Sequence, residues 1–121
     1  MKKILGILFL FVLLIGCQNP EAYQNVSVEE AQQIILDQNV TVLDVRTPEE
    51  VKEGYIPNAT FIPLQELSQR VNELDPKKAY LVVCRSGKRS TKASEWLAQN
   101  GFTQIYNMNG GMMSWDGDIT K

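Results

Sequence analysis

The sequence predicts an α/β fold in which a parallel β-sheet carries helices on both faces, giving three layers. Helical patterns, with apolar residues three or four positions apart, alternate along the chain with short apolar runs such as 40–45 and 80–84. The connections between them are short, and strands that are buried on both faces read as continuous apolar runs. In such sheets, ligands bind beyond the carboxyl ends of the strands.

The beginning of the chain has the pattern of an export signal. Lys2 and Lys3 precede an apolar stretch over residues 4–15. This pattern is typical of a secretory signal peptide, and the stretch is too short to span a membrane comfortably.

The residues that follow this stretch resemble the lipobox of bacterial lipoproteins, Leu14-Ile15-Gly16-Cys17. The resemblance implies cleavage before Cys17 and lipidation of its thiol, for example with palmitate. We therefore expect a signal peptide over 1–16, a lipidated N-terminus and tether over 17–24, and a domain over 25–121. The protein would then be extracytoplasmic and anchored by lipid to a bacterial membrane. An ordinary secretory signal with a chance cysteine is the alternative.

Two helix-start signals mark the first half of the domain. Ser27 and Glu30 form a capping box, which predicts a helix over 28–37 before the strand at 40–45. Thr47, Pro48 and Glu50 fit the N-cap, N1 and N3 positions of a second, short helix.

The remaining elements follow in alternation. Gly54 is expected to end the second helix at its C′ position. The apolar pattern then predicts a strand over 59–62 and a helix over 64–72. The central strand is placed at 80–84, followed by a helix ending at 100–101, a strand at 104–107, and a glycine turn at 110–111 that leads into a final helical segment.

Cys84 lies where the central strand ends and a polar loop leads into a helix. Loop N–H groups and the positive end of a helix converge at such a point and stabilise an anion or a thiolate. Arg85, Lys88 and Arg89 add three cations within five positions. The pattern predicts a nucleophilic thiolate, and the alternative is a buried core cysteine beside an ordinary solvated loop.

Composition narrows the chemistry further. The chain has no histidine, which excludes a Cys-His dyad, a Ser-His-Asp triad and a histidine metal site, and we expect neither a metal nor a cofactor. If Cys17 carries lipid, Cys84 is the only free thiol and no disulfide forms within the chain. The net charge of −2 argues against nucleic acid as a partner, so the basic loop indicates a local anion site.

Four segments resemble the single-domain rhodaneses in order and spacing, over about residues 25–117. These segments are residues 44–50, 54–59, 84–90 and 110–115. The resemblance implies a rhodanese-like fold and a thiosulfate:cyanide-type sulfurtransferase. Such an enzyme moves sulfane sulfur from a donor such as thiosulfate to cyanide or a thiol through a persulfide, which here would form on Cys84.

The resemblance also assigns the loop after Cys84 to substrate binding. The expected substrate-binding residues are Arg85, Ser86, Gly87, Lys88 and Arg89. Arg85 and Lys88 would favour an anionic donor, and Arg89 would close the loop. Because no second thiol is available, the persulfide would pass to an external thiol or protein acceptor.

Two positions depart from the family pattern, and two others have an open role. Tyr55 replaces the usual histidine and is expected to be structural, while Asn58 replaces a glycine and tolerates a left-handed turn. Asp44 could orient loop groups near Cys84. Alternatively, Arg46 could pair with a carboxylate such as Glu53 and pin the chain, and we favour structural roles for both Asp44 and Arg46.

Other functions remain as alternatives. The nearest is a phosphatase or arsenate reductase with a Cys-x5-Arg loop, but the position of that arginine holds Ser90. The second is an anchored sulfur-carrier or binding module without efficient turnover. A thiol-disulfide oxidoreductase generally requires a second nearby cysteine.

Overall fold

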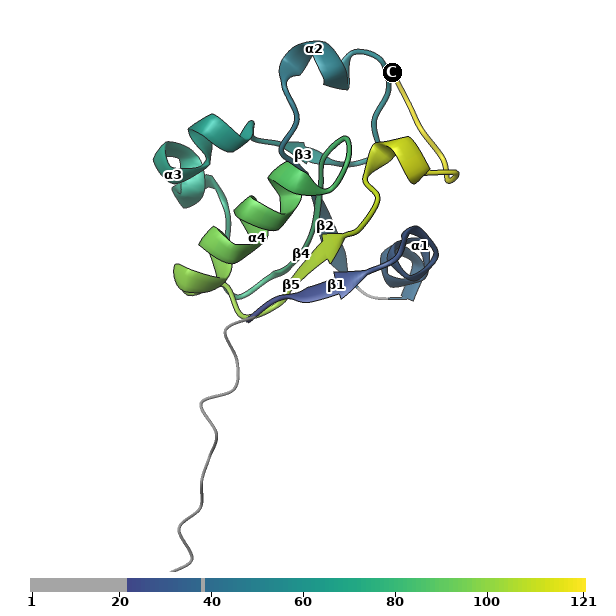
Figure 1. Cartoon of the computed structure of the whole chain (residues 1–121). Helices are drawn as coiled ribbons and strands as arrows, with labels where there is room; N and C mark the ends of the chain where they lie inside the picture. Colours follow the sequence, from purple (N-terminus) through teal and green to yellow (C-terminus); the bar gives the residue numbers. More distant parts are fainter. Residues whose placement is uncertain (1–21, 38) are drawn as a thin grey trace, which may run out of the picture.

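Five parallel strands form one sheet in the order β1-β5-β4-β2-β3 (Figure 1). The computed structural model describes residues 22–37 and 39–121. The strands are Gln24–Val26 (β1), Val40–Asp44 (β2), Thr60–Phe61 (β3), Ala79–Val83 (β4) and Ile105–Met108 (β5). The α/β fold with a parallel sheet is therefore confirmed.

The helices cover both faces of this sheet (Figure 1). The α-helices are Val28–Asp37 (α1), Pro48–Val51 (α2), Leu67–Arg70 (α3) and Lys88–Gln99 (α4). Three 3-10 turns, η1 to η3, cover Leu64–Glu66, Val71–Glu73 and Met112–Ser114. Helices α3 and α4 lie on one side of the sheet and α1 lies on the other, which gives the expected three layers.

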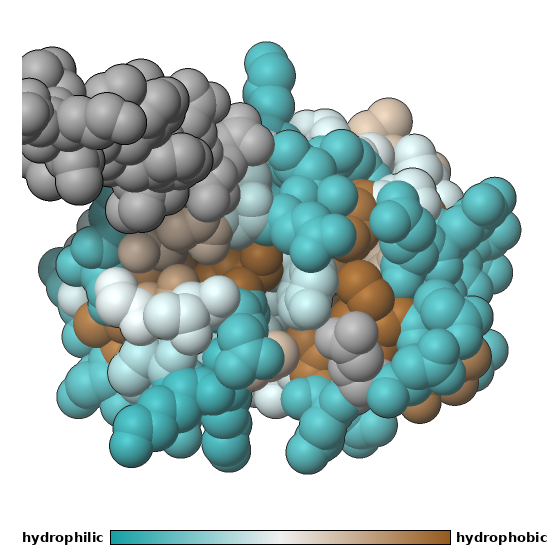
Figure 2. Space-filling model, turned by 90° about the horizontal axis from the view of Figure 1, so that it is seen from below, coloured by the Kyte–Doolittle hydropathy of each residue, from teal (hydrophilic) through white to brown (hydrophobic). Residues whose placement is uncertain are grey.

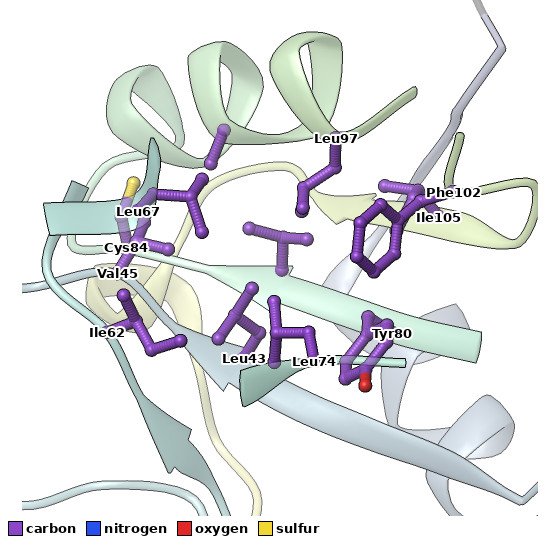
Figure 3. Packing of buried hydrophobic residues seen from close by; sticks show 12 residues of the cluster. Leu43, Val45, Ile62, Leu67, Leu74, Tyr80, Cys84, Leu97, Phe102 and Ile105 are labelled. Atoms are coloured by element: carbon purple, nitrogen blue, oxygen red, sulfur yellow. The ribbon is translucent and has the colours of Figure 1, made fainter. Parts of the chain in front are cut away.

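The central strand β4 separates two hydrophobic clusters. Tyr80, Val82 and Cys84 face the cluster beneath α3 and α4, while Leu81 and Val83 face the cluster beneath α1. Side chains of a strand alternate between the two faces, and both faces of this strand are covered. The uninterrupted apolar run 80–84 follows from that burial. Figure 3 shows the Cys84 sulfur at the end of the first cluster.

Both predicted capping boxes are present. At α1, the amide of Glu30 donates to Ser27 Oγ and the amide of Ser27 donates to Glu30 Oε1, both at 3.1 Å. At α2, Thr47 and Glu50 make the same reciprocal pair. Gly54 differs from the prediction because α2 ends at Val51 with Lys52 as its C-cap, so the glycine lies two residues after the C-cap and not at the C′ position.

Two other segments differ from the sequence prediction. The predicted helix over 64–72 is broken into η1, α3 and η2, although Leu64, Leu67 and Val71 all pack against the same cluster as predicted. Strand β1 was not predicted, because only Val26 of its three residues is buried and the apolar signal is weak. It pairs with β5 at the edge of the sheet.

The turns behave largely as expected from their residues. Asn58 has a φ of 66°, the left-handed conformation that was expected of it. Tyr55 has a structural role, because it forms a β-bridge with Thr120 and an edge-on contact with Phe61 at 4.9 Å between ring centroids.

Several expectations fall outside the described residues, namely the signal peptide over 1–16, the lipidated Cys17 and most of the tether. Among the described residues, no helix has the length and apolarity needed to cross a membrane.

Figure 2 shows the molecule from below, where hydrophobic side chains lie between hydrophilic ones.

Candidate active site

The candidate site is built around Cys84, which directly follows β4 at its carboxyl end. The residue is fully buried. Its sulfur accepts hydrogen bonds from the backbone amides of Gly87 at 3.0 Å and Ser90 at 3.3 Å. Amide donors favour negative charge on the atom that accepts them. The loop therefore curls around the sulfur atom, as the strand-loop-helix pattern predicted.

Gly87 gives the loop its tight curvature. It is the N-cap of α4 and has a φ of 99°, a left-handed conformation that a side chain would make costly. Its amide points to the sulfur of Cys84, while its carbonyl accepts hydrogen bonds from the hydroxyls of Ser90 and Thr91. Gly87 is thus part of the site through its backbone.

Ser90 is a site residue that sequence reasoning missed. Its fully buried hydroxyl lies 3.4 Å from the Cys84 sulfur and 3.1 Å from the carbonyl of Gly87. In the sequence, this position lay within the family-like segment 84–90 and where a phosphatase would carry arginine, but no role was expected of Ser90 itself. Its place in the first turn of the helix, where backbone amides have no intrahelical acceptor, was the available signal.

The glycine turn at residues 110–111 and the residues after it pack against the cysteine loop. The amides of Met112 and Met113 donate to the carbonyls of Cys84 at 2.8 Å and Arg85 at 3.0 Å. A Cβ atom on Gly111 would overlap with the carbonyl of Arg85, so the two backbone segments touch. The glycine turn was expected from the sequence, but its contact with the cysteine loop was not.

The three cations of the loop separate in the structure. Arg85 and Lys88 are exposed, whereas Arg89 turns to α2 and forms a bidentate ion pair with Glu50 at 2.6 and 2.8 Å. Hydrogen bonds from Arg89 lower the pKa of the Glu50 carboxyl from 4.5 to about 2. Arg89 therefore ties the loop to α2, and its guanidinium is engaged in that contact.

Asp44 and Arg46 form a buried pair at the carboxyl end of β2. Arg46 Nη2 lies 2.7 Å from Asp44 Oδ2, and the same nitrogen donates to the carbonyl of Gly54. The pair pins the segment after α2, which agrees with the structural role we favoured. The partner differs from the expected Glu53, because Asp44 lies two residues away and its carboxylate faces Arg46 directly.

Two open grooves flank the cysteine loop. We call the first the methionine groove; its apolar wall is formed by Met112, Met113, Trp115 and Ile119, and its polar wall includes Arg85, Glu50 and Glu53. The second, the lysine groove, lies on the α4 side and is lined by Ser86, Lys88, Lys92, Thr91, Glu95 and Asn109. Each groove thus holds one exposed cation of the loop.

Thiol and carboxylate side chains do not gather into a cluster with metal-ligand spacing among the described residues. Across residues 22–37 and 39–121, no group of three or more Cys, Asp or Glu side chains could hold a metal ion. The chemistry available to the described site is that of a buried sulfur, loop amides and exposed cations.

Comparison with known proteins places the chain in a family. Residues 27–118 match the rhodanese-like domain family. The chain belongs to the rhodanese family. It is a single rhodanese-like domain, and the Cys84 loop lies within the matched residues.

Individual relatives agree with this assignment. The chain is 39% identical over 87 residues to the Bacillus subtilis protein named "Putative sulfurtransferase YtwF", covering 72% of this chain and 84% of that one. It is 34% identical over 101 residues to "Putative sulfur carrier protein YrkF" of the same organism, covering 83% of this chain but only 55% of that longer protein. A solved rhodanese-like domain protein from Staphylococcus aureus is 38% identical, with a TM-score of 0.72, and the match covers 78% of this chain and 92% of that one.

Proposed function

We propose that this rhodanese is a sulfurtransferase that carries sulfane sulfur as a persulfide on Cys84. One observation carries the proposal: the Cys84 sulfur accepts hydrogen bonds from two backbone amides at the centre of a strand-to-helix loop. Family membership and relatives named for sulfur transfer and sulfur carriage support the same role.

The first half-reaction loads the enzyme. The Cys84 thiolate attacks the outer sulfur of thiosulfate, an S–S bond forms, and the old S–S bond breaks with its electron pair leaving on sulfite. The amides of the loop stabilise the negative charge on the sulfur. In the described part of the chain, the amides of Ser86, Lys88 and Arg89 have no protein acceptor and are available to an anion.

The second half-reaction discharges the persulfide. A thiophile such as cyanide or a thiolate attacks the outer sulfur, and the S–S bond breaks with its electron pair returning to the Cys84 thiolate. Thiocyanate or an acceptor persulfide is released. No external reductant or oxidant is required, because the sulfane sulfur only changes its carrier.

The cations divide between two tasks in this proposal. Lys88, in the lysine groove, and Arg85, in the methionine groove, attract the anionic donor. Arg89 acts as a positioning residue through Glu50 and keeps the loop in its curled form. Asp44 and Arg46 support the neighbouring segment without touching the sulfur.

Intact mass of the full chain, purified in detergent, tests the proposal directly. After incubation with thiosulfate, we expect a gain of one sulfur atom that cyanide removes, and no gain in Cys84→Ser. No gain with thiosulfate or any other sulfane donor would refute the proposal.

A sulfur carrier without efficient turnover is the second candidate, and the similarity to a relative named as a sulfur carrier favours it. Steady-state thiocyanate production distinguishes the two. A carrier would load one sulfur per molecule but discharge it slowly to cyanide, whereas an enzyme would release thiocyanate over many turnovers.

We also propose that the domain is exported and anchored to a bacterial membrane through a lipid on Cys17, as the lipobox-like segment suggests. In a bacterial host, the wild-type chain should incorporate labelled fatty acid and fractionate with membranes. Cys17→Ala should lose the label. Equal labelling of both proteins would exclude Cys17 as the lipidation site.

A further inference from the structure

We infer that the methionine groove is the docking site for an acceptor protein whose cysteine is flanked by an apolar side chain and a carboxylate. The inference rests on the proposed function and specifies its acceptor. The groove lies next to the loop that carries the reacting sulfur, because Arg85 of that loop is part of its lining.

The apolar wall of the groove is unusually exposed. Leu36, Met113 and Ile119 are the large hydrophobic residues exposed to solvent in the described part of the chain, at 80%, 71% and 54%. Two of the three line this groove. Clustered exposed hydrophobic residues inside a polar rim mark protein interaction sites, and methionine adapts its shape to different partners.

The groove is joined directly to the reacting residue. Met112 and Met113 donate their amides to the carbonyls of Cys84 and Arg85, so the apolar wall and the cysteine loop form one continuous backbone surface. A partner side chain seated on Met113 would therefore hold a neighbouring cysteine close to the loop. This geometry serves transfer because the acceptor thiolate must reach the outer sulfur of the Cys84 persulfide.

Arg85 is the cation of the groove that can pair with a carboxylate of the partner, whereas Glu53 in the same lining disfavours a carboxylate placed beside it. Arg46 is paired with Asp44, and Arg89 is paired with Glu50. Arg85 is exposed and has no ion pair within residues 22–37 and 39–121. Once sulfite has left the site, Arg85 is the groove's available arginine for an acidic residue of the acceptor.

The open shape of the groove suits a side chain that projects from a larger partner. Its volume is about 280 Å³. Small-molecule sites typically enclose most of the ligand, whereas this groove is open to solvent. An apolar anchor from a protein fills such a groove and leaves the rest of the partner on the rim.

Discharge of the loaded full chain in detergent tests the inference. Cys84 is first loaded from thiosulfate and then discharged by one of three acceptors. Two are capped pentapeptides, glycine-leucine-cysteine-glutamate-glycine and the same peptide with serine in place of leucine, and the third is cyanide. We expect the leucine peptide to react about tenfold faster than the serine peptide, the discrimination that one apolar contact typically provides.

Variants locate this preference in the groove. Met113→Gln and Ile119→Thr should abolish the advantage of the leucine peptide, while discharge by cyanide stays unchanged because cyanide does not need the groove. Leu36→Gln is the matched control, since Leu36 is equally apolar and more exposed but lies outside this groove. It should keep the advantage.

Equal discharge rates with the two peptides would overturn the inference. It would also be overturned if Leu36→Gln lost the rate advantage of the leucine peptide as fully as Met113→Gln and Ile119→Thr. Slower cyanide discharge in Met113→Gln and Ile119→Thr would also overturn it, because it would show a general disturbance of the loop. These outcomes leave the proposed function intact as long as Cys84 loads and cyanide unloads it. Failure of loading itself would refute the proposed function and this inference with it.

Discussion

Ser90 and Ser94 are two fully buried serines of α4 with different surroundings. The Ser90 hydroxyl lies 3.4 Å from the Cys84 sulfur, whereas the Ser94 hydroxyl has no hydrogen-bond partner in the described part of the chain. In the thiol form the sulfur donates to this hydroxyl, and the hydroxyl donates to the carbonyl of Gly87. When the thiol loses its proton, the hydroxyl can turn its hydrogen to the sulfur, and a hydrogen bond to a charged group contributes roughly 1.5–3 kcal/mol. We expect Ser90→Ala to slow sulfur loading from thiosulfate about tenfold, measured by rapid-quench mass spectrometry.

Ser94→Ala is the control for this prediction. It removes a hydroxyl that gains nothing from its surroundings, so loading should be unchanged and the free energy of unfolding equal or higher. Equal loading rates in the two variants would show that the Ser90 hydroxyl does not act on the sulfur.

Glu50 links α2 to the cysteine loop through Arg89, and this link makes stability depend on pH. The folded-state pKa of Glu50 is about 2, below the ordinary 4.5, so its stabilisation is complete above pH 4.5 and is lost as pH falls towards 2. The two side chains remain 32% and 23% exposed, and solvent screening limits the contribution of such a pair to about 1 kcal/mol.

Glu50→Gln should therefore lower the free energy of unfolding by about 1 kcal/mol at pH 7. Urea unfolding between pH 7 and 2 should show a smaller loss of stability on acidification than in the wild-type chain. Glu49→Gln is the matched control at an exposed neighbour and should behave as wild type. A pH profile of Glu50→Gln that coincides with wild type would contradict the role of the ion pair.

At the scale of elements, the contact between the glycine turn and the cysteine loop can be tested by adding one methyl group. Gly111 has a φ of 62°, and a Cβ there would overlap with the carbonyl of Arg85. Gly101 has a φ of 92° and nothing within 4 Å of the added Cβ. Both positions have a positive φ, which makes a side chain costly, but Gly111 also has a ψ of −164°, a conformation almost confined to glycine, and it alone adds a clash.

Gly111→Ala should lower the free energy of unfolding by more than Gly101→Ala and should also reduce sulfur loading. Gly101→Ala should cost roughly 1–2 kcal/mol with loading unchanged. Thermal unfolding and mass-based loading measure both effects. Similar stability and sulfur loading in the two variants would show that neither property depends on the contact between the turn and the cysteine loop.

The helix starts formed as predicted, because their sequence signals involve residues close together in the chain. Both capping boxes formed because each involves residues three positions apart, whose geometry depends only on the helix start. The helix over 64–72 divided into shorter turns, and strand β1 was missed. Local patterns report which face is buried more reliably than how many turns of regular helix cover it.

At the scale of the molecule, the sheet has a hydrophobic cluster on each face, and these clusters hold the strand ends together. Leu43 is fully buried in the cluster beneath α3 and α4. Leu43→Ala should lower the free energy of unfolding by about 2–5 kcal/mol, because it removes buried methyl groups and leaves a cavity. Leu36→Ala, at a residue that is 80% exposed, is the control and should change it by less than about 0.5 kcal/mol. Chemical denaturation measures both, and equal effects would contradict the assigned core.

The sequence by itself determined the α/β class, the position of the candidate nucleophile and the family to which the chain belongs. Each depends on information that is local or linear: apolar runs, helix starts, and a cysteine directly before a glycine-containing basic loop. Burial on both faces makes a parallel strand apolar throughout, so the strand that carries Cys84 could be recognised without knowing its neighbours.

Only the tertiary structure decided which partners the charged side chains pair with. Arg89 and Glu50 are 39 positions apart and meet because α2 and α4 both begin at the carboxyl edge of the sheet. The same folding brings Gly111 against Arg85 and places Met113 and Ile119 beside the cysteine loop. Flexible charged side chains choose partners by distance in space, and sequence spacing does not encode that distance between separate elements.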